Sequence, residues 1–212
     1  MLQITNYRKA YGAEPVLTIP ELALSQGTYW LKGENGAGKS TLLRSIAGLI
    51  PFDGDIRVDN INLRKQRMAY TRIVSLAEAE PVYPSFLTGA DLLLFYRKTK
   101  GENILLQEVT GAFGMQGYLK NKIGSYSSGM LKKLSLLLAF AGSQKLILLD
   151  EPFITLDADA VRVLQNVIAD LSEKDTSFII SSHQELGLAV SYGILKVRQH
   201  RIQKESDALV NG

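Results

Sequence analysis

Apolar residues along the chain follow two different spacings, which divide the sequence into three parts. Short apolar segments fill the first third and have glycine or proline nearby, as is typical of strands; they are residues 2–7, 16–19 and 28–31. Between about residues 84 and 141 the spacing of apolar residues is that of helices. The last third alternates again, and its pattern predicts strands at 146–149, 177–180 and 193–197 and a helix at 158–171.

Two local patterns refine this picture. Apolar residues on one face predict a helix over residues 40–50, which Pro51 would end. Asp53 and Gly54 then predict a hairpin turn. Because uninterrupted apolar strands alternate with helices along the chain, we expect an α/β fold with a parallel sheet.

The 212 residues are expected to form a single domain, with a core at 1–77 and 142–212 and an inserted helical subdomain at about 78–141. The composition, 46% hydrophobic and 21% charged, is that of a folded protein. The absence of cysteine excludes disulfides, thiolate zinc sites and a cysteine nucleophile. A formal charge of +3 does not indicate nucleic-acid binding. No signal peptide is visible and no apolar run approaches the roughly 18 residues of a membrane span, so we expect a soluble intracellular protein.

A glycine-rich motif at residues 33–40 carries the clearest chemistry. Its sequence, Gly-Glu-Asn-Gly-Ala-Gly-Lys-Ser, fits the pattern G-x-x-x-x-G-K-[ST] between a predicted strand and a predicted helix. Glycines let backbone N–H groups turn inward around a phosphate, and the helix N-terminus adds partial positive charge. Lys39 would add a full charge for the terminal phosphates, and Ser40 a hydroxyl for Mg²⁺. The strand–loop–helix context favours a nucleotide site over a plain glycine turn.

Polar residues end two of the predicted apolar strands. Asp150 and Glu151 follow one of them, at the edge of a parallel sheet where ligands bind. Asp150 there can hold Mg²⁺ opposite Ser40, and Glu151 can orient or deprotonate a water. His183 follows the other strand and could donate a hydrogen bond to a γ-phosphate. Acidic strand ends and surface histidines are common without function, but the upstream phosphate loop favours a catalytic role for the carboxylates.

Residues 125–130, Ser-Tyr-Ser-Ser-Gly-Met, precede a further predicted helix. Ser127 is a good N-cap residue, so helix capping alone accounts for it. A serine- and glycine-rich helix start is also a place for an anion. Spacing alone does not explain why one chain would have two anion sites.

The whole chain resembles the nucleotide-binding ATPase subunit of ATP-binding-cassette (ABC) transporters. Several of its motifs have the same order and spacing as in that family. They are Tyr11 and residues 33–41, 127–130, 146–151, 155–157 and 183. The 126–130 motif looks most like exporter-type cassettes whose membrane permease is a separate chain. The resemblance implies a P-loop NTPase (RecA-like) core with a mostly parallel sheet, an N-terminal antiparallel β subdomain and an inserted α-helical subdomain.

The resemblance also implies ligands, partners and a location. The cofactors would be ATP and Mg²⁺, and the partners a transmembrane permease and a second ATPase protomer, most simply an identical one, with no nucleic acid. The chain would be cytoplasmic and peripheral on the inner face of the cell membrane. ATP would close the dimer and hydrolysis would reopen it, which would drive transport.

Roles follow from the resemblance position by position. Tyr11 would stack on adenine, and Ser127 and Gly129 would touch the γ-phosphate of ATP held by the opposite protomer. Asp157 would lie where the protomers communicate. The residues around the phosphates would be Gly33, Glu34, Asn35, Gly36, Ala37, Gly38, Lys39, Ser40 and Thr41. The catalytic residues would be Lys39, Glu151 (the general base) and His183 (the switch histidine), and the metal ligands Ser40, Asp150 and Glu78.

Three positions depart from the family pattern. Members usually carry glutamine in the loop that joins the core to the helical subdomain, where Glu78 is the counterpart here. Its carboxylate can ligate magnesium but adds negative charge beside the phosphates. Ser128 replaces a usual glycine and Met130 a usual polar residue. We therefore expect hydrolysis that is slow or depends strongly on a partner.

Two other functions fit part of the sequence. A P-loop small-molecule kinase would need mobile cations, and the available cluster is Arg64, Lys65, Arg67 and Arg72. An ATP-gated regulatory module with weak hydrolysis would fit the departures at Glu78 and Met130. The loop over 78–87 offers apolar contacts for a membrane partner, or else packs against its own helical subdomain; these residues are Val82, Tyr83, Pro84, Phe86 and Leu87.

Overall fold

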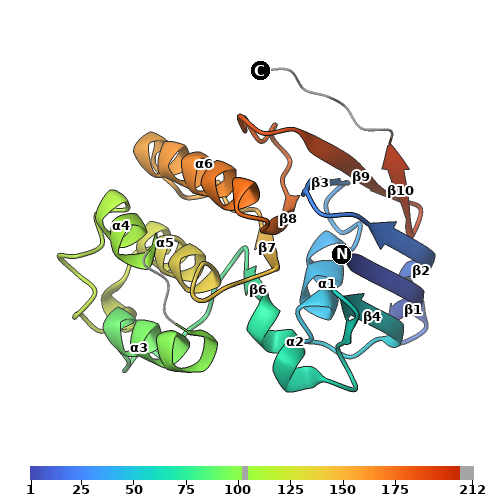
Figure 1. The fold of residues 1–212 in the computed structure, drawn as a ribbon, viewed down its shortest axis with the longest axis horizontal. Helices are drawn as coiled ribbons and strands as arrows, with labels where there is room; N and C mark the ends of the chain where they lie inside the picture. Colours follow the sequence, from blue (N-terminus) through green and yellow to red (C-terminus); the bar gives the residue numbers. More distant parts are fainter. Residues whose placement is uncertain (102–104, 206–212) are drawn as a thin grey trace.

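The computed structural model describes residues 1–101 and 105–205. A six-stranded sheet with the order β10-β9-β3-β8-β7-β6 forms the centre of the molecule (Figure 1). Its strands are β3 (Thr28–Lys32), β6 (Val74–Ala77), β7 (Leu146–Asp150), β8 (Ser177–Ser181), β9 (Tyr192–Arg198) and β10 (Arg201–Glu205). Every neighbouring pair is parallel except β9 and β10, which confirms the predicted α/β fold with a mostly parallel sheet.

A second sheet is antiparallel and has the order β2-β1-β4-β5. Its strands are β1 (Leu2–Tyr11), β2 (Glu14–Leu24), β4 (Asp53–Val58) and β5 (Ile61–Asn62). The antiparallel N-terminal part implied by the family resemblance is therefore present.

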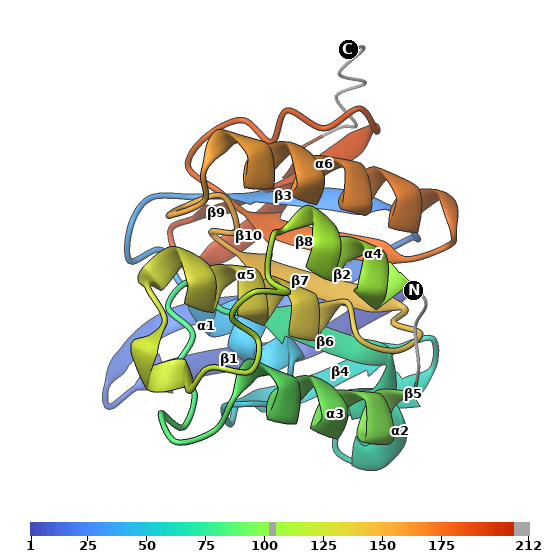
Figure 2. The same ribbon diagram turned by 90° about the vertical axis from the view of Figure 1, so that its left-hand side faces the viewer.

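Helices cover both faces of the central sheet. They are α1 (Lys39–Ile46), α2 (Arg67–Ile73), α3 (Gly89–Lys100), α4 (Leu105–Ala112), α5 (Ser128–Ala139) and α6 (Ala158–Glu173), with a short 3-10 helix, η1 (Ile123–Ser125). In Figure 1, α3, α4 and α5 gather at the end of the molecule opposite the antiparallel sheet, and Figure 2 shows α4 beside α6, with α3 at the far side of the group. The boundaries predicted for a helical subdomain, about 78–141, remain a prediction.

Strand β7 shows why the central strands read as unbroken apolar runs. Leu146 and Leu148 belong to a core shared with α1 and the antiparallel sheet. Ile147 and Leu149 point to the other face, into a core shared with α4, α5 and α6. Because successive side chains of a strand alternate between faces, a strand covered by helices on both faces must be apolar throughout.

The helix predicted over residues 40–50 is shorter than expected. It ends at Ile46 because Gly48 adopts a positive φ of 73°. The N–H of Gly48 then bonds the carbonyl of Ser45 and the N–H of Leu49 bonds that of Arg44. This pair of bonds is a Schellman motif, which ends the helix before Pro51 is reached.

The predicted hairpin turn at Asp53–Gly54 is also wrong. Both residues lie inside β4, whose Asp53 pairs with Arg8 of β1. The turn between β4 and β5 is formed instead by Asp59 and Asn60, with φ of 48° and 64°. Asparagine and aspartate tolerate this left-handed backbone, so they can replace glycine in a tight hairpin.

Candidate functional site

The glycine-rich motif forms the loop between β3 and α1, as predicted. Gly36 and Gly38 have φ of 77° and 98°, a backbone region that glycine enters without strain. Gly38 is the N-cap residue of α1. A Cβ atom on Gly38 would lie 2.9 Å from Cγ1 of Val16, so packing against β2 also requires a glycine here. The loop thus turns its backbone around the start of α1, where the helix dipole favours anions.

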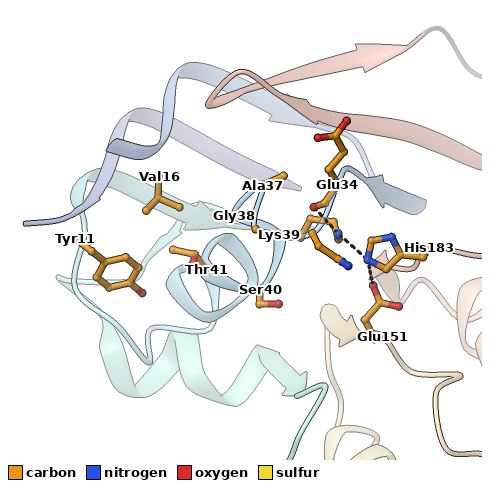
Figure 3. Close-up of a pocket in the computed structure, with 12 residues that line it drawn as sticks. Tyr11, Val16, Glu34, Ala37, Gly38, Lys39, Ser40, Thr41, Glu151 and His183 are labelled. Carbon is orange, nitrogen blue, oxygen red and sulfur yellow. Dashed lines mark hydrogen bonds and ion pairs between the residues drawn. The ribbon is translucent and has the colours of Figure 1, made fainter. Parts of the chain in front are cut away.

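A pocket of about 340 Å³ lies over this loop (Figure 3). It collects eleven of the predicted site residues from separate parts of the chain, together with Val16, which the sequence did not single out. The lining residues are Tyr11, Val16, Glu34, Asn35, Gly36, Ala37, Gly38, Lys39, Ser40, Thr41, Glu151 and His183. Gly33 is packed behind the loop, where its Cβ position would lie 3.0 Å from the carbonyl oxygen of Val197.

Lys39 is the cation of the pocket, and only 7% of its surface is exposed. Its ammonium nitrogen donates hydrogen bonds to the carbonyl oxygens of Gly33 at 2.8 Å and Glu34 at 3.2 Å. Burial lowers the pKa of Lys39, while the nearby carboxylates of Glu151 and Asp150 raise it in part. The lysine is therefore held inside the loop by backbone oxygens, with two carboxylates close enough to act on its charge.

His183 joins Lys39 to Glu151 (Figure 3). Its Nε2 atom lies 3.2 Å from Nζ of Lys39 and 3.4 Å from Oε1 of Glu151. Oε1 of Glu151 is buried and has no hydrogen-bond partner among the residues that the structure describes. Nε2 of His183 is the neighbouring polar atom, and an acceptor such as this oxygen can also bond a donor such as water.

The backbone at Glu151 is itself unusual. Its φ is 43°, in the left-handed region that costs a residue with a side chain some strain. The N–H of Glu151 is held by the carbonyl oxygen and the hydroxyl of Ser181, each at 3.1 Å. The same hydroxyl donates to Oδ1 of Asp150 at 2.5 Å. Ser181 thus fixes both acidic residues, a role that sequence reasoning missed.

Asp150 and Glu78 lie outside the lining of the pocket. Asp150 is 2% exposed at the end of β7. Glu78 directly follows β6, and its Oε1 accepts a hydrogen bond from Nε of Arg44 at 2.8 Å. Arg44 lies in the last turn of α1. The extra negative charge predicted at Glu78 therefore has a positive partner, which the sequence did not reveal.

Ser127 and Gly129 are not brought to the pocket within one chain. Ser127 caps α5, since its hydroxyl accepts a hydrogen bond from the N–H of Met130 at 3.3 Å. A Cβ atom on Gly129 would lie 2.9 Å from the carbonyl oxygen of Thr155. The predicted 127–130 and 155–157 motifs therefore pack against each other. An ion pair of 2.9 Å between Lys133 and Asp157 adds to this contact.

Tyr11 lies at the end of β1, and 57% of its surface is exposed at the edge of the pocket. The ammonium group of Lys9 lies 4.7 Å from the centre of its ring. Lys9 is anchored in turn by a hydrogen bond of 2.8 Å to the carbonyl oxygen of Pro51. One edge of the pocket is thus an open aromatic ring, to which a flat ligand has access.

The apolar residues of the 78–87 loop fall into two groups, one packed against the rest of the chain and one exposed. Tyr83 and Leu87 pack against the core of the molecule. Val82 and Phe86 are 88% and 71% exposed. Leu94 and Phe95 of α3 are also exposed apolar residues.

The cationic cluster required by a kinase is not arranged around the pocket. Arg64 donates to the carbonyl oxygen of Phe52, and Arg67 to that of Gly48 at 2.9 Å. None of the four cations of that cluster lines the pocket. Among the described residues, no helix is long and apolar enough to cross a membrane.

The chain is similar to known proteins over most of its length. Residues 20–154 match the family model described as ABC transporter. The chain is 31% identical over 191 residues to the linearmycin resistance ATP-binding protein LnrL of Bacillus subtilis (strain 168), an alignment that covers 86% of this chain but 61% of LnrL. It is 29% identical over 179 residues to the cytochrome c biogenesis ATP-binding export protein CcmA of Yersinia pestis, covering 83% of this chain and 82% of that protein.

Solved structures share the fold. An ATP-binding subunit of an ABC transporter has a TM-score of 0.86 at 24% identity, covering 97% of this chain and 89% of that one. A dimeric ATP-binding cassette in a post-hydrolysis state, bound to ADP and phosphate, has a TM-score of 0.81 at 18% identity, covering 97% and 98%. The P-loop NTPase fold and the family resemblance are thereby confirmed, and this chain belongs to the ABC transporter family as an ATP-binding cassette.

Proposed function

We propose that this chain binds and hydrolyses ATP as one half of a cassette dimer that drives a separate transmembrane permease. The observation that carries the proposal is the pocket in which Lys39, Glu151 and His183 meet, although they come from three distant parts of the sequence. The names of the relatives support it, because LnrL and CcmA are named as ATP-binding proteins of resistance and export.

The pocket holds the nucleotide along its length. The exposed ring of Tyr11 stacks on adenine at one end. The backbone N–H groups of the loop and the dipole of α1 hold the phosphates. Lys39 turns its ammonium from the carbonyls of Gly33 and Glu34 to the terminal phosphates, which charge-assisted bonds favour.

Glu151 acts as the general base of hydrolysis. Its buried Oε1 accepts a hydrogen bond from the attacking water and then takes its proton. His183 donates a hydrogen bond to the γ-phosphate while its ring stays beside that same oxygen. Lys39 stabilises the negative charge that develops on the phosphate oxygens.

The residues around the phosphates also fit Mg²⁺, which prefers oxygen ligands. We assign it to the Ser40 hydroxyl and the Asp150 carboxylate, with Glu78 nearby. Ser181 uses Oδ1 of Asp150, which leaves Oδ2 for a cation. Within residues 1–101 and 105–205 no group of three or more acidic or histidine side chains forms a metal site by itself, so phosphate and water oxygens complete the ligand set. When bound, Mg²⁺ supplies positive charge to the phosphates.

A second protomer explains why Ser127 and Gly129 lie away from the pocket. They stand at the N-terminus of α5, where backbone N–H groups and the helix dipole favour an anion. Placed against the pocket of a partner chain, this helix start would contact the γ-phosphate bound there. Two chains arranged head to tail would then enclose two nucleotides.

The permease would dock on the apolar surface formed by Val82 and Phe86 with Leu94 and Phe95. All four side chains are exposed, and exposed apolar residues that form a patch mark interaction surfaces. We also propose that residues 78–141 move as one subdomain and carry this surface. The chain would then sit on the cytoplasmic face of the membrane, held there by its permease.

Two measurements test the proposed function. The purified chain should release phosphate from MgATP without any acceptor, since a kinase would need one. Affinity purification from native membranes should recover a protein with several membrane spans. Recovery of a soluble partner would instead favour the regulatory module, and ADP formation only with an added acceptor would favour the kinase.

A further inference from the structure

Lys132 is a charged residue that is almost completely buried, with 1% of its surface exposed. It lies on α5, and its ammonium nitrogen donates to three backbone carbonyl oxygens. The acceptors are Glu78 at 2.9 Å, Ala79 at 2.7 Å and Asp150 at 3.3 Å. An ammonium group has three donor hydrogens, so the three carbonyls match its full bonding capacity.

These carbonyl groups belong to two segments that carry different functional residues. One is the loop after β6, which carries Glu78 and continues to the exposed Val82 and Phe86. The other is the end of β7, which carries Asp150 and Glu151. Strands β6 and β7 are parallel neighbours whose pairing reaches Ala77 and Leu149. Lys132 thus joins the two segments just beyond the point where their own ladder ends.

A buried charge at this position is expensive, because water can no longer solvate it. Further along α5, Leu134, Leu136, Leu137 and Leu138 pack in the core. An apolar side chain at 132 would therefore fit the helix face but would bond none of the three carbonyls. The ammonium group of Lys132 therefore serves to hold these backbone segments in place.

We infer that Lys132 is a positioning residue that fixes the loop of residues 78–80 against the carboxylate end of β7, and so sets Glu78 and Glu151 in register for ATP hydrolysis. The effect on catalysis rests on the proposed function. The three hydrogen bonds from Lys132 to the two segments, called the tie below, do not depend on it. A displacement of the loop by a docked permease would reach the backbone of Asp150 through this side chain as well as through the pairing of β6 with β7.

Lys100 offers a matched control. This partly buried lysine bonds β6, the strand that leads into the 78–80 loop, through the carbonyl oxygen of Val74 at 3.2 Å and the hydroxyl of Ser75 at 2.6 Å. Those atoms lie at the start of β6, at the opposite end from the carboxylates. Lys100→Met removes a comparable cation from the same strand without touching the pocket.

Hydrogen exchange of the free chain tests the tie directly. Lys132→Met should speed exchange of the backbone amides at residues 78–80 by about tenfold, since local opening becomes easier. Lys100→Met should leave those amides unchanged. Exchange at residues 78–80 that is the same in Lys132→Met and wild type would overturn the inference, whether or not the chain hydrolyses ATP.

Steady-state hydrolysis tests the consequence. Lys132→Met should lower kcat by about tenfold to a hundredfold, as small misplacements of catalytic groups do, with KM for MgATP within about twofold. Lys132→Arg should restore most of kcat, and Lys100→Met should keep it. Equal kcat in Lys132→Met and Lys100→Met would overturn the catalytic part.

The two proposals can fail separately. A wild-type chain that hydrolyses no ATP even together with its permease would refute the proposed function, while the exchange experiment would still decide the tie. If Lys132→Met does not fold, Lys132→Gln keeps two donors without the charge and is read by the same exchange measurement. Faster exchange at residues 78–80 in that variant supports the tie, and unchanged exchange overturns it.

Discussion

Nε2 of His183 lies 3.4 Å from Oε1 of Glu151. The two side chains follow neighbouring parallel strands, β8 and β7, which end at the same edge of the sheet. The residue proposed to bond the γ-phosphate is thus in contact with the residue proposed to deprotonate water. Loss of either side chain should therefore affect the chemical step more than nucleotide binding.

Glu151→Gln should lower kcat by about 10²-fold to 10⁴-fold, the usual contribution of a general base. Glutamine keeps the size of the side chain, so ATP should still bind and should hold the dimer closed. Light scattering should show the mass double with ATP and Mg²⁺. The double variant with Lys39→Ala serves as the control and should stay monomeric. Persistence of a monomeric Glu151→Gln at saturating ATP would refute the head-to-tail dimer.

Lys39→Ala should weaken ATP binding by about 100-fold, because it removes charge-assisted bonds to the terminal phosphates. Isothermal calorimetry with ATP and with adenosine measures this loss. Adenosine lacks phosphates, so its affinity should hardly change. An equal loss for both ligands would mean that the variant damages the fold and not the phosphate contact.

Glu78→Gln should raise the affinity for MgATP and raise kcat by a few-fold, since it removes a negative charge beside the phosphates. Arg44→Gln should do the opposite, because Glu78 then loses its positive partner at 2.8 Å. Both side chains are partly exposed, so each effect should shrink at high salt. If both variants shifted the affinity for MgATP in the same direction, the result would contradict a functional ion pair between Glu78 and Arg44.

Asp157 should make part of the fold's stability depend on pH. Hydrogen bonds from the Ala160 N–H and Lys133 lower its pKa in the folded chain below the ordinary value of about 3.9. A lowered pKa stabilises the fold above the unfolded value, and this contribution disappears as pH falls through the folded value.

Asp157→Asn keeps the helix cap but not the charge, so it isolates this contribution. The variant should be less stable than wild type by about 0.5 kcal/mol at pH 7 and equally stable near pH 2. Thermal unfolding followed by circular dichroism at a series of pH values measures the difference. A difference that is constant across the series would exclude the ionised carboxylate as its source.

The sequence predicts those parts of the fold in which burial dictates the residue type. Strands β7 and β8 could be found because helices cover both of their faces. Strand β10 was missed because its side chains, Arg-Ile-Gln-Lys-Glu, are mostly exposed, and only its pairing with β9 makes it a strand. Helix α2 and strand β6 are too short for their apolar spacing to be distinctive.

The candidate site divides in the same way. The phosphate loop is contiguous in sequence, so its geometry could be expected from local residues. Ser181 and Arg44 act through contacts with Asp150 and Glu78, 31 and 34 residues away, and no local pattern announces such contacts. Lys132 was missed as well, because it stands beside Lys133 and nothing in the sequence tells which of the two lysines is buried.

The way Lys39 is held in the loop affects how a nucleotide binds. A flexible loop must give up conformational freedom when a ligand arrives, and that loss weakens association. Here the ammonium already braces the carbonyls of residues 33 and 34, so the cradle has its shape before any triphosphate enters. Binding then requires mainly that this side chain swing outward, so the loop loses little conformational freedom when the nucleotide enters.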